Sequence, residues 1–152
     1  MNREIKFRAK PLKGGYPWVY GNAVLQVKGK AYLLEDNEAE VIPDFDRESS
    51  FYTVDGLIEV DTKTIGQYTG LKDKKGKEIY EGDILEYIGK RKDNMNKVYR
   101  RKSVFHEGMF ALLSKELPAY SALNYHCMED GRSAWRVIGN TYDNPEMMEG
   151  KV

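Results

Sequence analysis

The side chains best suited to acid–base, nucleophilic or metal chemistry are His106, His126 and Cys127. A cysteine–histidine pair gives an activated thiolate only when the two side chains meet. Adjacent residues point to opposite faces of a strand, and away from each other on a helix, so His126 and Cys127 are poorly placed for such a pair. The interval from His106 to His126 matches no compact metal-ligand spacing. We therefore predict ordinary surface or packing roles for all three, with no catalytic residue, no metal and no cofactor.

Three carboxylates, Glu78, Glu81 and Asp83, surround Gly82. A metal or acid–base role would require them to converge with the two histidines, as in an enzyme acting on nucleotides or DNA. The simpler interpretation is that Asp83 accepts backbone N–H groups in a turn. The stretch from Gly70 to Gly76 superficially resembles a phosphate loop, but it lacks the Gly-Lys-Ser/Thr ending that reaches phosphate and metal.

A basic run at residues 90–102 is the strongest candidate for a contact surface. Seven bases oppose only Asp93, for a local charge of +6, and an aromatic ring lies among them; the residues are Lys90, Arg91, Lys92, Lys97, Tyr99, Arg100, Arg101 and Lys102. Tyr99 could stack on a base while the cations hold phosphates. Residues 35–48 carry the opposite charge, seven acids against one base, or −6. The two runs could instead neutralise each other within one subunit or across subunits of an oligomer.

The whole chain of 152 residues is electrically balanced, with 24 basic and 24 acidic residues. This balance disfavours a protein that coats nucleic acid without regard to sequence. A single cysteine excludes an internal disulfide, and no apolar run approaches the ~20 residues that span a bilayer. The N-terminus lacks the apolar core of a secretory signal. We expect a cytoplasmic protein with no membrane contact.

Residues 64–84 hold the densest turn signals in the chain, and they predict a scaffold rather than a reaction centre. The Asp73-Lys74-Lys75-Gly76 segment is typical of a type I turn closed by a residue with positive φ. We expect structural turns at six positions: Gly70, Asp73, Gly76, Gly82, Asp83 and Gly139.

Strand patterns and turn signals alternate along the rest of the chain. Hairpins are expected around residues 28–30, at Asp55-Gly56, at a long tip between residues 88 and 98, and at Glu107-Gly108. Residues 117–128 fit a short helix or a loop, and helical turns are expected after Asp61 and at Pro145. The predicted fold is mostly β, an antiparallel sheet packed on a small SH3-like barrel with one or two short helices. Residues 1–63 would form the sheet and residues 64–152 the motif segment and barrel, or residues 1–152 one integrated domain.

Three stretches resemble the YopX family of phage and prophage proteins. They are the central IGQYTGLKDKKGKEIYEGDI (residues 65–84), the N-terminal REIKFRA (residues 3–9) and the C-terminal VIGNTYDNPE (residues 137–146). The resemblance implies a phage-derived cytoplasmic protein with a β-rich, partly barrel-like fold that forms a homo-oligomer. It implies no known activity and carries over no catalytic residue.

These observations favour a non-enzymatic binding or assembly module. The alternative is a nucleic-acid-binding module that uses Tyr99 and the basic residues of the 90–102 segment. A cleft containing both histidines would instead favour an enzyme.

Overall fold

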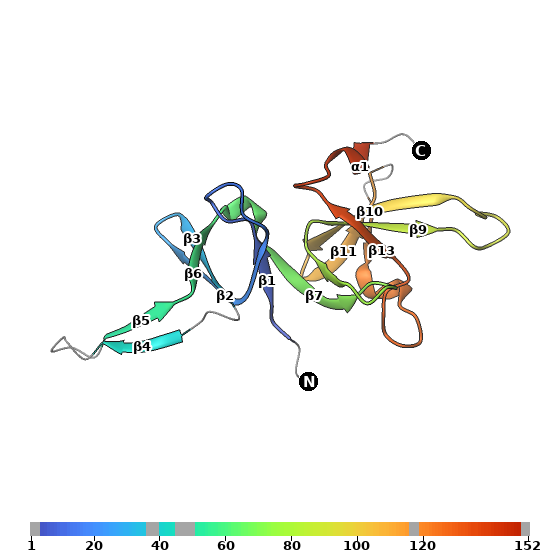
Figure 1. Cartoon of the computed structure of the whole chain (residues 1–152). Helices are drawn as coiled ribbons and strands as arrows, with labels where there is room; N and C mark the ends of the chain where they lie inside the picture. Colours follow the sequence, from blue (N-terminus) through green and yellow to red (C-terminus); the bar gives the residue numbers. More distant parts are fainter. Residues whose placement is uncertain (1–3, 36–39, 45–50, 116–118, 150–152) are drawn as a thin grey trace. The chain divides into compact units, whose positions relative to one another are not determined.

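A computed structural model describes residues 4–35, 40–44, 51–115 and 119–149. The chain forms two compact units, Met1–Gln67 and Tyr68–Val152. The expected division after residue 63, or a single integrated domain over residues 1–152, stays a prediction. Both units consist mainly of antiparallel strands, so the prediction of a mostly β fold is confirmed (Figure 1).

Unit 1 is a sheet whose strands run in the order β6-β3-β2-β1-β7. Alternating burial along its strands places small and branched apolar side chains on one face, where they form the core of this unit: Ala9, Val19, Ala31, Leu33 and Val60. The strands are β1 (Phe7–Ala9), β2 (Val19–Val27), β3 (Lys30–Glu35), β6 (Leu57–Val60) and the first residues of β7 (Gly66–Lys72).

The β2–β3 hairpin has the turn that the sequence predicts, and β2 also contains a bulge. Lys28 and Gly29 both have positive φ, 49° and 78°, as a two-residue turn between right-twisted strands requires. The register shifts between Gly21 and Ala23. A Cβ on Gly21 would lie 1.8 Å from the carbonyl oxygen of Leu34, so only glycine fits at this bulge.

The Asp55-Gly56 pair does not make the hairpin that the sequence predicts. Strand β5 (Phe51–Asp55) pairs with β4 (Glu40–Asp44), and β6 pairs with β3 instead of β5. Gly56 keeps its positive φ of 83°, and its carbonyl accepts the N–H of Glu35 at 3.1 Å. The glycine thus joins two strands that have different partners. Strand β4 lies within the acidic run at residues 35–48.

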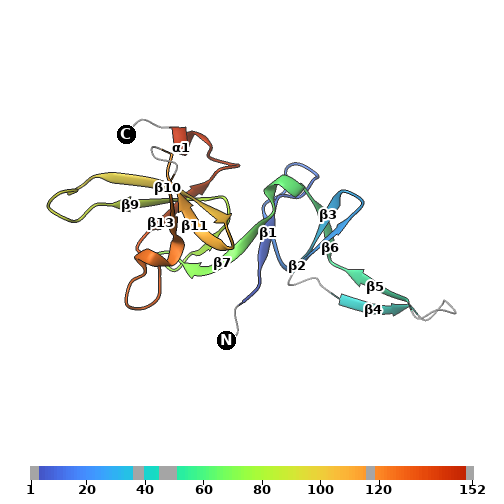
Figure 2. The ribbon, with the colours of Figure 1, turned by 180° about the vertical axis from the view of Figure 1, so that it is seen from behind.

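Unit 2 is an open five-stranded antiparallel sheet in the order β12-β11-β10-β9-β13, preceded by the pairing of β7 with β8 (Figure 2). The expected SH3-like barrel is not observed. Within the described part of unit 2, no pairing between the first and last strands closes the sheet. Strand β12 pairs only with β11, and after Ala122 the chain enters a 3-10 turn, so β12 and β13 are the two edges of the sheet. The bounds are β8 (Glu78–Tyr80), β9 (Asp83–Ile88), β10 (Val98–His106), β11 (Met109–Leu113), β12 (Tyr120–Ala122), β13 (Arg136–Asn140) and the 3-10 helix η2 (Leu123–His126).

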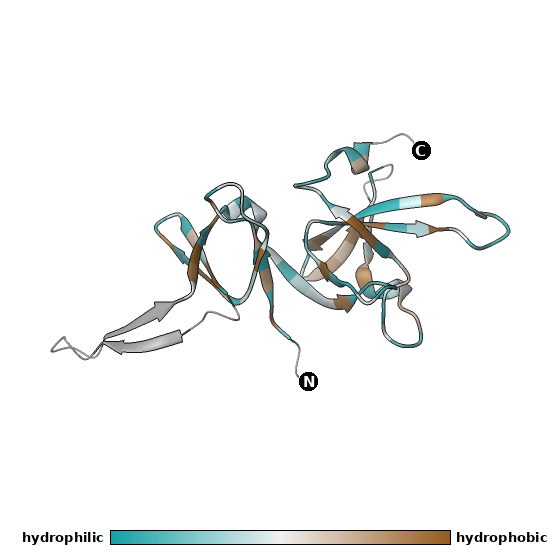
Figure 3. Ribbon diagram, viewed as in Figure 1, coloured by the Kyte–Doolittle hydropathy of each residue, from teal (hydrophilic) through white to brown (hydrophobic). Residues whose placement is uncertain are grey.

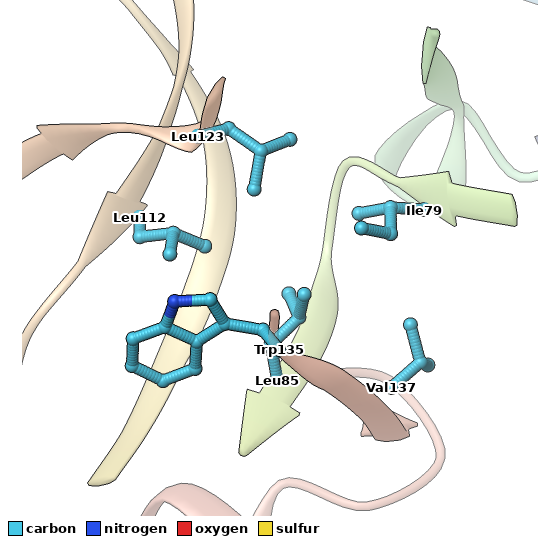
Figure 4. Close-up of a cluster of buried hydrophobic side chains, with 6 residues drawn as sticks. All are labelled: Ile79, Leu85, Leu112, Leu123, Trp135 and Val137. Carbon is cyan, nitrogen blue, oxygen red and sulfur yellow. The ribbon is translucent and has the colours of Figure 1, made fainter. Parts of the chain in front are cut away.

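Six buried side chains from different elements form the core of unit 2 and point toward one another (Figure 4): Ile79, Leu85, Leu112, Leu123, Trp135 and Val137. Tyr87 and Tyr99 pack against this cluster from the neighbouring strands β9 and β10. The core of the unit therefore merges at one end into a group of aromatic rings.

Two short helical turns lie where the sequence predicts them. The 3-10 helix η1 (Thr62–Thr64) is capped by Asp61, whose Oδ1 accepts the N–H of Lys63 at 3.1 Å. Helix α1 (Glu146–Glu149) begins directly after Pro145. None of the helices in the described ranges has the length and apolar character needed to cross a bilayer.

Candidate functional site

Asp73, in the middle of the family-like central segment, is a buried carboxylate that binds backbone. It is 1% exposed. Its Oδ1 accepts the N–H groups of Lys75 at 2.8 Å and Lys77 at 2.9 Å, and its Oδ2 accepts the N–H of Val137 at 2.9 Å. The N–H of Gly76, whose φ is 87°, donates to the Asp73 carbonyl at 2.9 Å and closes the predicted turn. One carboxylate thus fixes its own turn and a strand 64 residues away in sequence.

The same turn also holds the residues that precede β13. The N–H of Lys74 donates to the carbonyl of Trp135 at 3.0 Å, and the N–H of Ser133 donates to the carbonyl of Lys72 at 2.7 Å. Together with the bond from Val137 to Asp73, these contacts fix the segment that carries the Trp135 indole. The central segment therefore acts as a scaffold for an aromatic side chain that lies far away in sequence.

The carboxylates around Gly82 serve local structure in the same way. Asp83 is 1% exposed and its Oδ2 accepts the N–H of Tyr80 at 2.8 Å, as predicted for a turn aspartate. The Tyr80 hydroxyl donates to Glu78 Oε2 at 2.7 Å. Gly82 has a φ of 86°, which suits glycine.

Two of the predicted turn glycines lie inside strands. Gly70 has a φ of 85° within β7, where the register with β8 shifts between Tyr68 and Lys72. Gly139 lies within β13 at the shift in register with β9, and a Cβ there would approach Asn144 Oδ1 to 2.5 Å. Both glycines permit a bulge rather than a chain reversal.

Of the two histidines and the cysteine, the structure describes the side chains of His106 and Cys127. The His106 ring stacks on Tyr120, with ring centroids 3.6 Å apart. Cys127 is exposed and its backbone bridges to Ser133. The side chain of His126 lies outside the described part of the structure. Among the side chains that are described, no three His, Cys, Asp or Glu residues gather as metal ligands would.

The basic run forms a hairpin, as predicted, but its cations do not share one face. Arg100 donates through Nε to Glu86 Oε2 and through Nη1 to the carbonyl of Met147, both at 3.2 Å. Arg101 Nη1 donates to Ser114 Oγ, one residue past the end of β11. Because side chains alternate along β10, Arg101 and Tyr99 lie on one face of the strand, and Arg100 and Lys102 on the other.

The remaining cations of the run belong to the loop between β9 and β10, which is teal in Figure 3. Lys90, Arg91 and Lys92 are exposed there. The ammonium of Lys97 lies 5.1 Å from the centre of the Tyr99 ring.

A pocket in unit 2 combines part of this run with aromatic residues from elsewhere in the chain. Its volume is about 330 Å³, and it is lined by Tyr87, Arg91, Asn94, Tyr99, Arg101, Tyr125 and Trp135. We call it the aromatic pocket. The ring of Tyr87 lies 5.5 Å from Trp135 and 6.3 Å from Tyr99, measured between centroids. Trp135 is 5% exposed, whereas Tyr125 is 79% exposed.

The loop beside the aromatic pocket is held by its own hydrogen bonds. The N–H of Gly89 donates to the carbonyl of Lys97 at 2.8 Å, and the N–H of Asn96 donates back to Gly89 at 3.0 Å. Asn94 Oδ1 accepts the N–H of Arg91 at 2.9 Å. A Cβ on Gly89 would lie 2.0 Å from the Asn94 carbonyl oxygen, so the close approach of the loop to itself requires glycine. The positions of Arg91 and Asn94 are thus fixed by the backbone around them.

The chemistry of the aromatic pocket is that of binding. Two of its lining residues are arginines and none is a carboxylate, a histidine or a cysteine. Aromatic faces with guanidinium groups suit a planar ligand that carries negative charge. Sequence reasoning found Arg91, Tyr99 and Arg101 as contact candidates but missed the other four lining residues. Tyr87 lies two residues after Leu85, and in a strand such residues share a face, so its packing beside the core was a usable signal for Tyr87.

A surface ion pair lies on the turn that precedes Ser133. Arg132 donates through Nε to Asp130 Oδ2 at 2.7 Å, and through Nη1 to the carbonyl of Lys74 at 3.0 Å. The hydrogen bonds from Arg132 lower the pKa of the Asp130 carboxyl, and the hydrogen bond to Asp130 raises the pKa of Arg132. This pair adds a further link between the Asp73 turn and the segment leading to Trp135.

Comparison with known proteins identifies the family but no activity. The chain is similar to protein EF1440 from Enterococcus faecalis, whose crystal structure aligns with a TM-score of 0.57 at 25% identity over 95% of this chain and 97% of that one. No curated protein matches the sequence. The profile of the YopX protein family matches residues 6–149. That match covers nearly the whole chain, including the Asp73 turn and every residue of the aromatic pocket, and the chain therefore belongs to the YopX family.

Proposed function

We propose that this protein is a non-enzymatic binding module whose second unit binds single-stranded nucleic acid in the aromatic pocket. The observation that carries the proposal is the presence of four aromatic and two guanidinium side chains around one cavity of about 330 Å³. Base stacking on aromatic side chains, combined with cations that hold the phosphates, is the usual way in which proteins bind single strands.

A single strand fits the pocket better than a duplex does. Bases in a duplex are already stacked on one another, whereas an unpaired base offers a free face to a ring such as Tyr125. The chain has no net charge, so binding must depend on a local site rather than on a broad basic surface. The exposed cations of the adjacent loop, Lys90, Arg91 and Lys92, supply that local charge.

Fluorescence anisotropy with labelled oligonucleotides tests the proposal. We expect single-stranded DNA or RNA to bind more tightly than a duplex of the same length, with an affinity that falls as salt rises. Tyr125→Ala removes the most exposed ring of the pocket and should weaken binding by about tenfold, since one stacked base is worth about 1–3 kcal/mol. The matched control is Tyr16→Ala, which removes a similarly exposed ring, 60% against 79%, from unit 1.

Charge is tested by a second matched pair in the loop between β9 and β10. Arg91→Gln and Lys92→Gln each remove one positive charge, but only Arg91 lines the pocket. We expect Arg91→Gln to weaken binding more than Lys92→Gln does. Equal losses in the two variants, or an affinity that Tyr125→Ala leaves unchanged, would reject the pocket as the binding site.

The other properties implied by the family resemblance stay predictions: a phage or prophage origin, a cytoplasmic location and a homo-oligomer. Pairing of the basic run with the acidic run would have to compete with the bonds that Arg100 already makes to Glu86 and Met147. The exposed Lys90 and Lys92 suit a test of that pairing better. If the pairing assembles the oligomer, changing both to glutamate lowers the mass measured by light scattering, and an unchanged mass excludes it.

A further inference from the structure

The turn of the central segment carries a second group of cations in unit 2, apart from those that line the aromatic pocket. Four lysines within residues 72–77 oppose only Asp73, so that four minus one gives a local charge of +3: Lys72, Lys74, Lys75 and Lys77. The side chains of Lys72, Lys75 and Lys77 are exposed, and that of Lys74 is half-buried. We call these four residues the basic turn.

The carboxylates beside the basic turn are engaged elsewhere. Asp73 is 1% exposed, and its two oxygens accept three backbone N–H groups. Glu78 pairs in register with Lys72, but it is half-buried and its Oε2 accepts the Tyr80 hydroxyl at 2.7 Å. Among the described residues, no carboxylate forms an ion pair with any of the four lysines. Their ammonium groups are thus available to an anionic ligand.

Hydrogen bonds join the basic turn to the segments that carry two rings of the aromatic pocket. The N–H of Lys74 donates to the carbonyl of Trp135 at 3.0 Å, and the Lys72 carbonyl accepts the N–H of Ser133 at 2.7 Å. Ser133 in turn forms a β-bridge with Cys127, two residues after Tyr125. Turn and pocket both belong to unit 2, and the turn therefore adjoins the wall of the pocket.

We infer that the basic turn holds phosphates of the same single strand, beyond the nucleotide that occupies the aromatic pocket. This inference rests on the proposed function and adds a second contact to it. The pocket's volume of about 330 Å³ is at the small end of ligand sites, so a longer strand must continue outside it. Lysine is a compact charge that attracts phosphate, and phosphate contacts carry no sequence information. The turn therefore adds affinity and salt dependence but no base preference.

The test compares a short strand with a longer one, measured by anisotropy on the whole chain. A strand of about three nucleotides fills the pocket, whereas one of about twelve, within the ~4–16 nucleotides that a single-strand-binding fold covers, also reaches the turn. We expect the longer strand to bind more tightly and with a steeper dependence on salt.

A matched pair of variants assigns the additional contact to the turn. Lys75→Gln removes one positive charge and keeps the backbone N–H that Asp73 accepts. Lys28→Gln makes the same change in unit 1, where the lysine likewise precedes a turn glycine with positive φ. For the longer strand, Lys75→Gln should reduce the slope of log affinity against log salt by about 0.7, the share of one phosphate contact. The ratio of wild-type to variant affinity should then grow about fivefold between ~1 M and ~0.1 M salt. Lys77→Gln repeats the measurement at a second exposed position.

The outcomes separate this inference from the proposed function. A salt slope that Lys75→Gln and Lys77→Gln leave unchanged, or an equal loss in Lys28→Gln, would overturn the role of the basic turn. So would an equal loss for the short strand, or for a duplex of the longer length. In each case single-strand binding in the pocket would stand. Failure of both strands to bind, or binding that Tyr125→Ala does not weaken, would reject the proposed function itself.

Discussion

Replacing Asp73 by asparagine should destabilise unit 2 far more than loss of a surface charge would. Asparagine keeps one oxygen for the N–H groups of Lys75 and Lys77, but it places an NH₂ group where Oδ2 accepts the N–H of Val137 at 2.9 Å. Two donors then face each other at a site that is 1% exposed. A buried donor left without an acceptor costs about 1–3 kcal/mol.

The two bonds that remain lose the reinforcement of the charge, which adds roughly 1 kcal/mol to the cost. We therefore expect Asp73→Asn to lower the free energy of unfolding by about 2–4 kcal/mol, a large share of the ~5–15 kcal/mol typical of a domain. The matched control is Asp93→Asn, the same substitution at an exposed position in the loop between β9 and β10.

Urea unfolding followed by tryptophan fluorescence measures this difference. The chain has two tryptophans, Trp18 in unit 1 and Trp135 in unit 2. In a Trp18→Phe background Trp135 is the sole tryptophan reporter, and it lies on the segment that Asp73 and Lys74 hold. An Asp73→Asn variant within about 0.5 kcal/mol of its parent, the range of ordinary surface substitutions, would refute the assigned scaffold role.

Three further predictions concern the loop and the surface charges. Gly89→Ala forces the loop apart, because its Cβ would lie 2.0 Å from the Asn94 carbonyl oxygen, and anisotropy should show weaker oligonucleotide binding with the urea midpoint little changed. Arg91→Gln should reduce the slope of log affinity against log salt by about 0.7, the share of one phosphate contact on a single strand, and an unchanged slope would contradict that contact. The folded-state pKa of Asp130 is lowered by Arg132, so the pair stabilises the fold above the unfolded pKa near 3.8 and this contribution is lost as pH falls through the lower folded value. The urea midpoint of Asp130→Asn should accordingly lie slightly below that of the wild type at neutral pH, and the difference should disappear in acid. A difference that grows as the pH falls would contradict the lowered pKa of Asp130.

Local turn chemistry made much of the fold predictable from the sequence. The turns at Lys28-Gly29, Asp73–Gly76 and Glu107-Gly108 each contain a glycine, which adopts positive φ without steric cost, and the structure places positive φ at Gly29, Gly76 and Gly108. Asp61 and Pro145 likewise mark helical turns through rules that act over a few residues. Such signals need no knowledge of distant parts of the chain.

Strand partners and the aromatic pocket could not be predicted in the same way. Asp55-Gly56 has the composition of a hairpin turn, but β3 and β4 provide better partners for the strands on either side of it. The pocket brings Tyr125 and Trp135 beside Tyr87 and Tyr99 through long-range pairing, and the bond between Asp73 and Val137 that helps to fix this arrangement spans 64 residues. Sequence patterns report the periodicity of a segment but not which other segment it will contact.

Trp135 allows a direct measurement of single-strand binding in the aromatic pocket. In the Trp18→Phe background, titration with an unlabelled single-stranded oligo(dU) should change the emission of Trp135 with the same apparent affinity that anisotropy gives. The change should be weakened by Tyr125→Ala and absent with a duplex. Tight oligonucleotide binding that leaves the Trp135 emission unaltered and is insensitive to Tyr125→Ala would contradict the placement of the ligand in this pocket.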